Sequence, residues 1–124
     1  MTEQHAQRQV QDAFILFQSG RLSEAENICR DLLQREPGNF AALHLLGFIA
    51  YQTNDAARAA ELIGAALEIN PYDAMAQNTY SAALVHLKRY GDAVQSAERA
   101  VALKPDFAGA YNNLGNAFTG LKQF

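Results

Sequence analysis

Three prolines divide the chain into equal lengths. Pro37, Pro71 and Pro105 are evenly spaced, and they are all the prolines of the 124-residue chain. We call this spacing of about 34 residues the proline period. It is typical of repeat proteins, in which each unit is one supersecondary element that packs against the next. Small or apolar residues recur with the same period at twelve, eight and five positions before each proline: Ala25, Ala59 and Ala93, then Cys29, Ile63 and Ala97, then Leu32, Ala66 and Ala100. We therefore expect a stack of similar units.

Within one period, the apolar pattern predicts two helices joined by a short turn. The first half of the second unit has the i, i+3, i+4, i+7 spacing of a helix face, at Leu43, Leu46, Gly47 and Ala50. Asn39 stands just before this face and suits a helix N-cap, and a second periodic run over residues 59–67 ends before Pro71. In the first unit, Ser23 and Glu26 have the spacing of a capping box. Together the units predict about seven helices.

This helix-turn-helix unit, with a period of about 34 residues, resembles the tetratricopeptide repeat (TPR). The resemblance rests on large and small residues at fixed positions of the second and fourth units: Leu43, Leu46, Gly47, Ala59, Ala66, Pro71, Tyr111, Leu114, Gly115 and Phe118. It implies an all-α fold, a right-handed superhelical solenoid of TPR units. Residues 1–5 then form an N-terminal tail, residues 6–39, 40–73 and 74–107 form three repeats, and residues 108–124 form the first helix of a fourth. The first repeat has Gln9 and Asp12 where the family usually has large apolar residues, which suits a capping repeat.

The chain also resembles the N-terminal TPR arrays of bacterial O-GlcNAc-transferase-like proteins. This second resemblance lies in residues 20–26 (GRLSEAE) and 42–47 (ALHLLG), whereas the general TPR pattern covers residues 6–124. The sequence ends in the turn after the first helix of a fourth unit, which favours a fragment of a longer protein.

Charge separates the first helix of each unit from the second. Residues 37–54, 74–87 and 107–121 contain no Asp, Glu, Lys or Arg, and each of these stretches holds a predicted first helix. The charges fall on second helices, for example at Arg58, Glu61 and Glu68. In the architecture that the TPR resemblance implies, first helices line a concave groove and second helices form the convex face. The sequence therefore predicts a neutral groove, and binding there should depend little on salt.

A second apolar face on the first helices marks the candidate binding groove. His44, Phe48 and Tyr51 stand at i, i+4 and i+7, opposite the packing face of their helix. The residues that stand one or two proline periods before or after these three complete the set: Val10, Phe14, Phe17, Asn78, Ala82, Val85, Asn112 and Asn116. Exposed aromatic side chains in a concave surface usually mark a binding site. Two alternatives stay open: burial of the aromatics against the next unit, and plain solvation of the asparagines on the helix surface.

These groove residues predict a protein or peptide partner. The TPR grooves that clamp acidic chaperone tails use Lys and Arg on first helices, and this sequence has neither at the lining positions, so we do not expect that use. Asparagine can hydrogen-bond a peptide main chain through both its carbonyl and its amide. Relatives of O-GlcNAc transferases hold extended segments by asparagine ladders, which the C-terminal end of this groove resembles. The alternative function is a structural N-terminal arm or self-assembly scaffold of a longer TPR protein or glycosyltransferase-like enzyme.

The predicted seventh helix ends in an apolar stripe. Phe118, Leu121 and Phe124 stand at i, i+3 and i+6, with no second helix in the sequence to cover them. An uncovered solenoid end tends to associate with another end or with an apolar groove. We therefore expect self-association, and a homo-oligomer, through this end.

Other function classes find little support in the sequence. The net charge is −3 and the ten Lys and Arg are scattered, so there is no basic stripe for nucleic acid. The N-terminus lacks a secretory signal and no stretch reaches the roughly 18 to 20 apolar residues of a membrane span, which predicts a cytoplasmic protein. Cys29 is predicted to be a buried thiol, and His5, His44 and His86 lack neighbours at metal-ligand spacing. We expect no enzyme activity, metal or cofactor.

Overall fold

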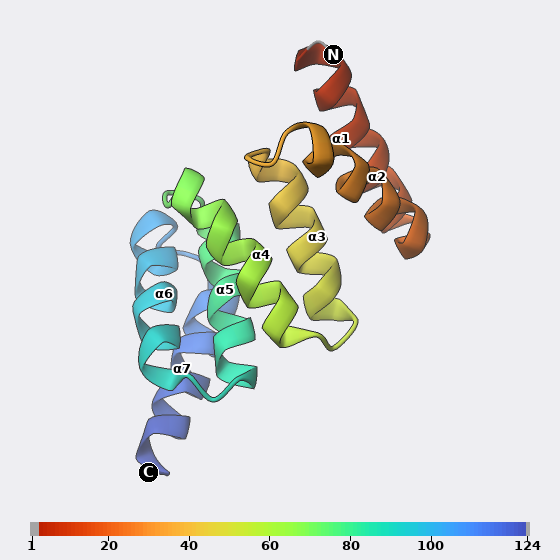
Figure 1. The fold of residues 1–124 in the computed structure, drawn as a ribbon. Helices are drawn as coiled ribbons and strands as arrows, with labels where there is room; N and C mark the ends of the chain where they lie inside the picture. Colours follow the sequence, from red (N-terminus) through yellow and green to blue (C-terminus); the bar gives the residue numbers. More distant parts are fainter. Residues whose placement is uncertain (1–2, 124) are drawn as a thin grey trace.

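Seven helices joined by short turns make up residues 3–123, the part of the chain that the computed structural model describes. They are α1 (Glu3–Gln18), α2 (Leu22–Arg35), α3 (Phe40–Gln52), α4 (Ala56–Ile69), α5 (Ala74–His86), α6 (Tyr90–Leu103) and α7 (Ala108–Lys122). Each helix packs against the next, and α1 also contacts α3, α3 contacts α5, and α5 contacts α7. The helices are stacked in chain order, with the two termini at opposite ends (Figure 1). Residues 3–123 contain no strand, so the predicted all-α solenoid of about seven helices is confirmed.

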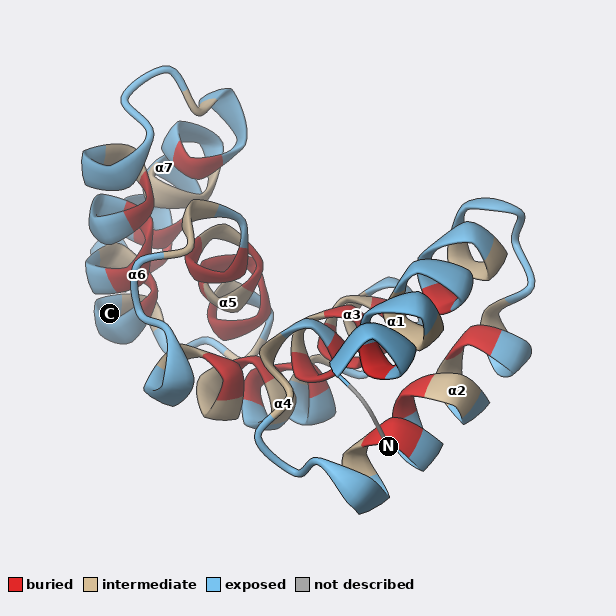
Figure 2. Cartoon of the chain, turned by 90° about the horizontal axis from the view of Figure 1, so that it is seen from above, coloured by how far each residue is buried: buried red, intermediate tan, exposed pale blue. Residues whose placement is uncertain are grey.

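The buried residues gather where neighbouring helices meet, while the outer faces are exposed (Figure 2). Every periodic position identified from the prolines is buried, and the nine residues there are at most 1% exposed. Most of them are alanines, and short side chains allow two helix backbones to approach closely. The regular recurrence of small residues therefore gives the same helix packing in each unit.

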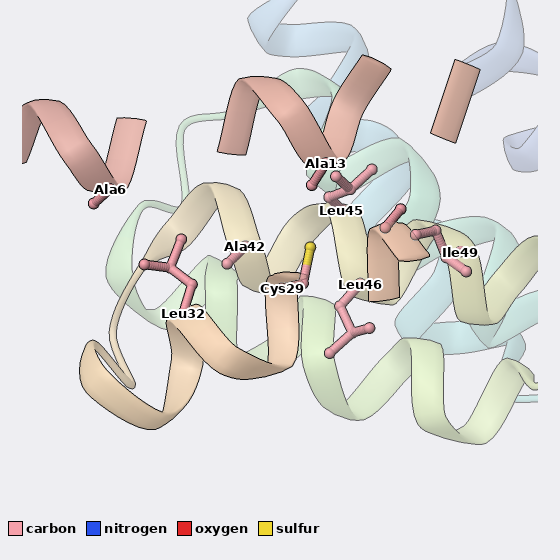
Figure 3. Packing of buried hydrophobic residues seen from close by; sticks show 9 residues of the cluster. Ala6, Ala13, Cys29, Leu32, Ala42, Leu45, Leu46 and Ile49 are labelled. Atoms are coloured by element: carbon pink, nitrogen blue, oxygen red, sulfur yellow. The ribbon is translucent and has the colours of Figure 1, made fainter. Parts of the chain in front are cut away.

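The first core cluster joins α1, α2 and α3 (Figure 3). Ala13, Cys29, Leu45 and Leu46 are among the buried side chains that meet there. Burial, with a smaller contribution from the nearby charge of Glu26, raises the pKa of the Cys29 thiol from 9.0 to about 11. The thiol is therefore protonated at neutral pH and acts as a small apolar side chain, as the sequence predicts.

The turn inside each unit has the same backbone shape three times. Gly20, Asn54 and Lys88 stand one proline period apart, and they have positive φ values of 81°, 67° and 61°. In each turn the following residue donates its N–H to the carbonyl five positions back, as Asp55 does to Ala50 over 2.8 Å. A left-handed residue just after a helix is a common way to end it and to satisfy its last carbonyls. The repeat period is therefore present in the backbone as well as in the side chains.

We expect Lys88→Gly to stabilise the protein by about 0.5 to 1 kcal/mol. A residue with a Cβ loses about 1 to 2 kcal/mol in the left-handed region, and the greater freedom of glycine in the unfolded chain offsets part of that gain. Urea denaturation followed by circular dichroism measures the change. Lys104→Gly is the matched control, since Lys104 ends α6 with a φ of −141° and should gain nothing. A loss of stability in Lys88→Gly would contradict the turn geometry.

The helix starts agree with the predictions in one unit and differ in another. Asn39 caps α3 as predicted, its Oδ1 accepting the Ala42 N–H at 3.0 Å. The capping box at Ser23 and Glu26 is wrong, because α2 already begins at Leu22 and no side chain caps it. Leu22 packs against the first core cluster. Because α2 starts at Leu22, Ser23 lies exposed inside the first turn and not at the N-cap.

Candidate functional site

A pocket of about 540 Å³ lies between α1, α3 and the start of α5. Five of the predicted groove residues line it: Val10, Phe14, Phe17, His44 and Phe48. The remaining lining residues are Gln11, Ile15, Phe40, Ala41, Leu45 and Met75. Among the described residues 3–123, none that lines the pocket carries a carboxylate, an ammonium or a guanidinium group. We call this site the aromatic pocket.

Aromatic rings form a connected wall in the aromatic pocket. The Phe17 and Phe48 rings meet edge to face with centroids 5.5 Å apart, and the Phe14 ring lies 6.2 Å from that of Phe17. Phe17 and Phe48 are half-buried by this packing, whereas Phe14 is 48% exposed. Met75, which lines the pocket from the start of α5, is 49% exposed. Large apolar side chains exposed around a concavity are typical of a binding surface.

Within the part of the chain that the structure describes, His44 is the one titratable side chain that lines the aromatic pocket. Its ring lies 5.7 Å from that of Phe40, between centroids. Burial lowers the pKa of His44 below its ordinary value of 6.5, and the charge of Asp73 opposes this shift. The imidazole is therefore neutral at physiological pH, so the aromatic pocket carries no charge.

The lowered pKa of His44 makes stability depend on pH. Below about pH 6.5 the unfolded chain takes up a proton that the folded His44 resists. We therefore expect the free energy of unfolding to fall as the pH drops from 6.5 toward the folded-state pKa. Urea denaturation of the wild type and of His44→Gln at several pH values isolates this contribution from the other titrating groups. Equal pH dependence in the two proteins would contradict the burial of His44.

The other predicted groove residues do not join the aromatic pocket. Tyr51 packs edge to face on His86, with centroids 5.5 Å apart, and borders a separate hollow at the end of α3. Ala82 is buried, and Val85 packs against the core between α5, α6 and α7. These three residues therefore pack in other parts of the solenoid and do not line the aromatic pocket.

The asparagines lie farther along the solenoid. Asn78 is half-buried, and its Oδ1 accepts a hydrogen bond at 2.8 Å from Nδ2 of Asn113. Asn112 and Asn116 are exposed on α7. Asn113 could not be predicted from the repeat, because it stands one position beyond a full proline period from Asn78.

Six residues of the aromatic pocket also escaped the sequence prediction: Gln11, Ile15, Phe40, Ala41, Leu45 and Met75. Phe40 stands four positions before His44, so one more helical turn in the same pattern would have found it. Met75 has no such signal, because it reaches the pocket from the next unit.

The predicted self-association end is open in the structure. Phe118 is 46% exposed and Leu121 is 42% exposed, while Phe124 lies outside the described residues. On the same helix a Cβ at Gly115 would meet no atom within 4 Å, although the equivalent glycine of the second unit, Gly47, lies tightly against Ile63 of α4. The outer face of α7 is therefore uncovered where α3 is covered.

Residues 3–123 contain neither a candidate metal site nor a candidate membrane span. No group of three or more His, Cys, Asp or Glu side chains in this range could hold a metal ion. No helix in it has the length and apolarity needed to cross a membrane.

Residues 16–83, more than half of the chain, match the sequence profile of the tetratricopeptide repeat, so the chain belongs to the TPR family. It is similar to the Hsp70-Hsp90 organizing protein of Triticum aestivum, with 43% identity over 56 residues, which are 45% of this chain and 10% of that protein. It is also similar to the peroxisomal targeting signal receptor of Candida glabrata, with 36% identity over 69 residues, 56% of this chain and 12% of the receptor. The chain thus spans about a tenth of the length of these relatives.

Solved structures show the same fold. An O-GlcNAc transferase mutant of Thermobaculum terrenum is 27% identical with a TM-score of 0.86, over 95% of this chain and 23% of the transferase. The first TPR of Spaghetti (RPAP3), bound to the HSP90 peptide SRMEEVD, is 20% identical with a TM-score of 0.90, over 98% of this chain and 97% of that one. TPR solenoids present extended concave surfaces of the kind that bind other proteins.

Proposed function

We propose that this chain is a protein-interaction module that binds an uncharged, largely apolar segment of a partner protein in the aromatic pocket. The observation that carries the proposal is the 540 Å³ apolar pocket, which side chains from three successive first helices line. A pocket of this size accommodates one or two large side chains. Burial of these side chains and of the aromatic rings that line the pocket, less the cost of association, gives an expected Kd in the micromolar range.

The charges of the groove helices argue against an acidic ligand. The peptide bound to the RPAP3 domain, SRMEEVD, ends in two glutamates and an aspartate around one valine. Helices α3 and α5 have no Lys or Arg. In α7 the one Lys or Arg is Lys122, the last residue of the helix, and in α1 it is Arg8, which does not line the aromatic pocket. A cluster of carboxylates would lose its hydration here without gaining an opposite charge. We therefore assign the groove to a neutral segment.

Asparagines extend the proposed binding surface toward the C-terminus. Asn112 and Asn116 are exposed on the first helix of the fourth unit, with their side-chain amides open to solvent. An extended segment anchored in the aromatic pocket would run toward them along α5 and α7. Their amides can pair with main-chain groups whatever side chains that segment carries.

Selection from a random peptide library, followed by isothermal titration calorimetry, tests this function. We expect the selected peptides to share large apolar residues, to lack acidic runs and to bind with micromolar Kd. The peptide SRMEEVD is the matched negative control and should bind at least tenfold more weakly. A selection dominated by acidic sequences, or one that yields no binder, would overturn the proposed function.

The uncovered face of α7 supports a second candidate function, a structural arm or self-assembly scaffold. The transferase that contains a similar solenoid is about four times longer than the matched region, so arrays of this kind do occur inside larger proteins. In the isolated chain, the most direct way to cover Phe118 and Leu121 is pairing with α7 of a second copy. Such pairing is isologous and closes as a dimer.

We expect this chain to self-associate in a concentration-dependent manner. Serine at Phe118 and Leu121 should weaken the association, because each substitution removes an exposed apolar side chain from the paired face. Sedimentation equilibrium over micromolar concentrations measures the effect, and Ile69→Ser, another exposed apolar position on a different helix, is the control. A wild-type protein that stays monomeric at high micromolar concentration would remove the dimer from the account.

A further inference from the structure

A second hollow, of about 410 Å³, opens at the N-terminal end of the aromatic pocket. The two sites are contiguous, because four residues line both: Val10, Gln11, Phe40 and Ala41. The remaining walls of the second hollow are Glu3, Ala6, Gln7, Glu36 and Asn39. A segment bound in the aromatic pocket would therefore continue into this hollow as it leaves α3.

The second hollow is acidic, unlike the aromatic pocket. Among residues 3–123, Glu3 and Glu36 are the only charged residues that line it, both are exposed, and neither takes part in the four ion pairs of this range. The cation next to Glu36 in sequence, Arg35, is paired with Asp31 and donates a hydrogen bond to Gln9. The site therefore combines a neutral apolar pocket with an edge of two carboxylates, which we call the acidic edge.

We propose that a lysine or arginine of the partner flanks the neutral segment bound in the aromatic pocket, and that this flanking residue pairs with Glu3 and Glu36. The inference rests on the proposed function and specifies its partner. The acidic edge has the charge opposite to such a residue and repels carboxylates. A segment with this composition, apolar then basic, matches both parts of the site.

The helix geometry fixes how far the basic residue stands from the anchor. Val10, in both hollows, and Glu3 are seven positions apart on α1, which at 1.5 Å per residue is about 10 Å. An extended peptide covers about 3.3 Å per residue, so about three residues span this distance. Phe14, deeper in the aromatic pocket, is about 16 Å from Glu3 along the helix, or about five residues of peptide. The basic residue therefore belongs three to five positions from the anchor.

Calorimetry with a matched set of synthetic peptides tests the inference. All peptides share one apolar anchor of phenylalanine and leucine, and they place a lysine, an alanine or a glutamate three, four or five positions to either side. We expect the lysine peptide with the matching spacing to bind more tightly than its alanine counterpart. Each carboxylate that the lysine contacts should increase the affinity about two- to fivefold, since exposed ion pairs are weak. The glutamate peptide should bind more weakly than the alanine peptide. Higher salt should reduce the lysine advantage and leave the affinity of the alanine peptide nearly unchanged.

Protein variants connect the lysine advantage to the acidic edge. The double variant Glu3→Gln with Glu36→Gln should abolish the difference between lysine and alanine peptides. The matched control, Glu61→Gln with Glu68→Gln, removes the same charge from exposed positions of α4 and should keep the difference. Equal affinity of lysine and alanine peptides, or an advantage that survives Glu3→Gln with Glu36→Gln, would overturn this inference alone. Absence of binding by every peptide would overturn the proposed function and this inference with it.

Discussion

Replacing Gly47 with leucine is expected to lower the free energy of unfolding by about 1 to 3 kcal/mol, because it overpacks the contact between α3 and α4. A Cβ at this position would lie 2.5 Å from Cγ1 of Ile63 and 3.3 Å from Cβ of Leu62. Ile63 is fully buried, so it has no free volume into which to move. The clash therefore has to be relieved by separating the two helices.

Gly115→Leu is the matched control for Gly47→Leu. Gly115 occupies the equivalent position of the fourth unit, yet a Cβ there meets no atom within 4 Å. Leucine should be tolerated or should stabilise α7 slightly, since glycine inside a helix costs about 1 kcal/mol relative to better helix formers. Urea denaturation followed by circular dichroism compares both variants. An unchanged midpoint for Gly47→Leu, or equal losses in the two, would contradict the repeat register.

Phe48→Ala is expected to weaken peptide binding by about 30-fold, because truncation of a central aromatic side chain in a binding site typically costs about 2 kcal/mol. Phe48 lines the aromatic pocket and holds the ring of Phe17 edge to face. The substitution therefore removes direct contacts with the ligand and also frees a neighbouring wall residue. Calorimetry with a library-selected peptide measures the loss.

Tyr51→Ala tests whether the bound segment contacts only the aromatic pocket or the whole helix face predicted from the sequence. The sequence places Tyr51 on the same helix face as Phe48, but the structure packs its ring on His86 outside the aromatic pocket. We therefore expect Tyr51→Ala to change the affinity less than threefold, which is within the usual range for a residue away from an interface centre. Equal losses in Phe48→Ala and Tyr51→Ala would show that the bound segment follows the whole predicted face instead.

The fold could be predicted from the sequence because the helix contacts depend on small residues at a fixed period. Ala25, Ala59 and Ala93 are all fully buried, as the spacing requires. The left-handed turn residues could not be predicted in the same way, since a glycine, an asparagine and a lysine occupy the three equivalent positions. Only the first two of these residue types favour such a conformation. The lysine adopts it because the helices on either side fix the turn.

The aromatic pocket could be predicted in part. Val10, Phe14 and Phe48 were found because one helix face repeats with the proline period. Side-chain length then decides which members of that face reach the ligand site: the short Ala82 is buried, and the long Tyr51 contacts the neighbouring helix. The sequence period therefore predicts where a residue lies around its helix, but it does not predict how deeply its side chain is buried.

Chemical-shift mapping of the bound state tests whether the aromatic pocket is the site that binds the partner segment. We expect titration with a selected apolar peptide to shift the backbone amide signals of Phe14 and Phe48 and the methyl signal of Met75 more than those of other residues. These three residues lie on α1, α3 and α5 and line one pocket. If the largest shifts fall instead on α4 and α6, or on the open face of α7 around Phe118, the aromatic pocket is not the binding site.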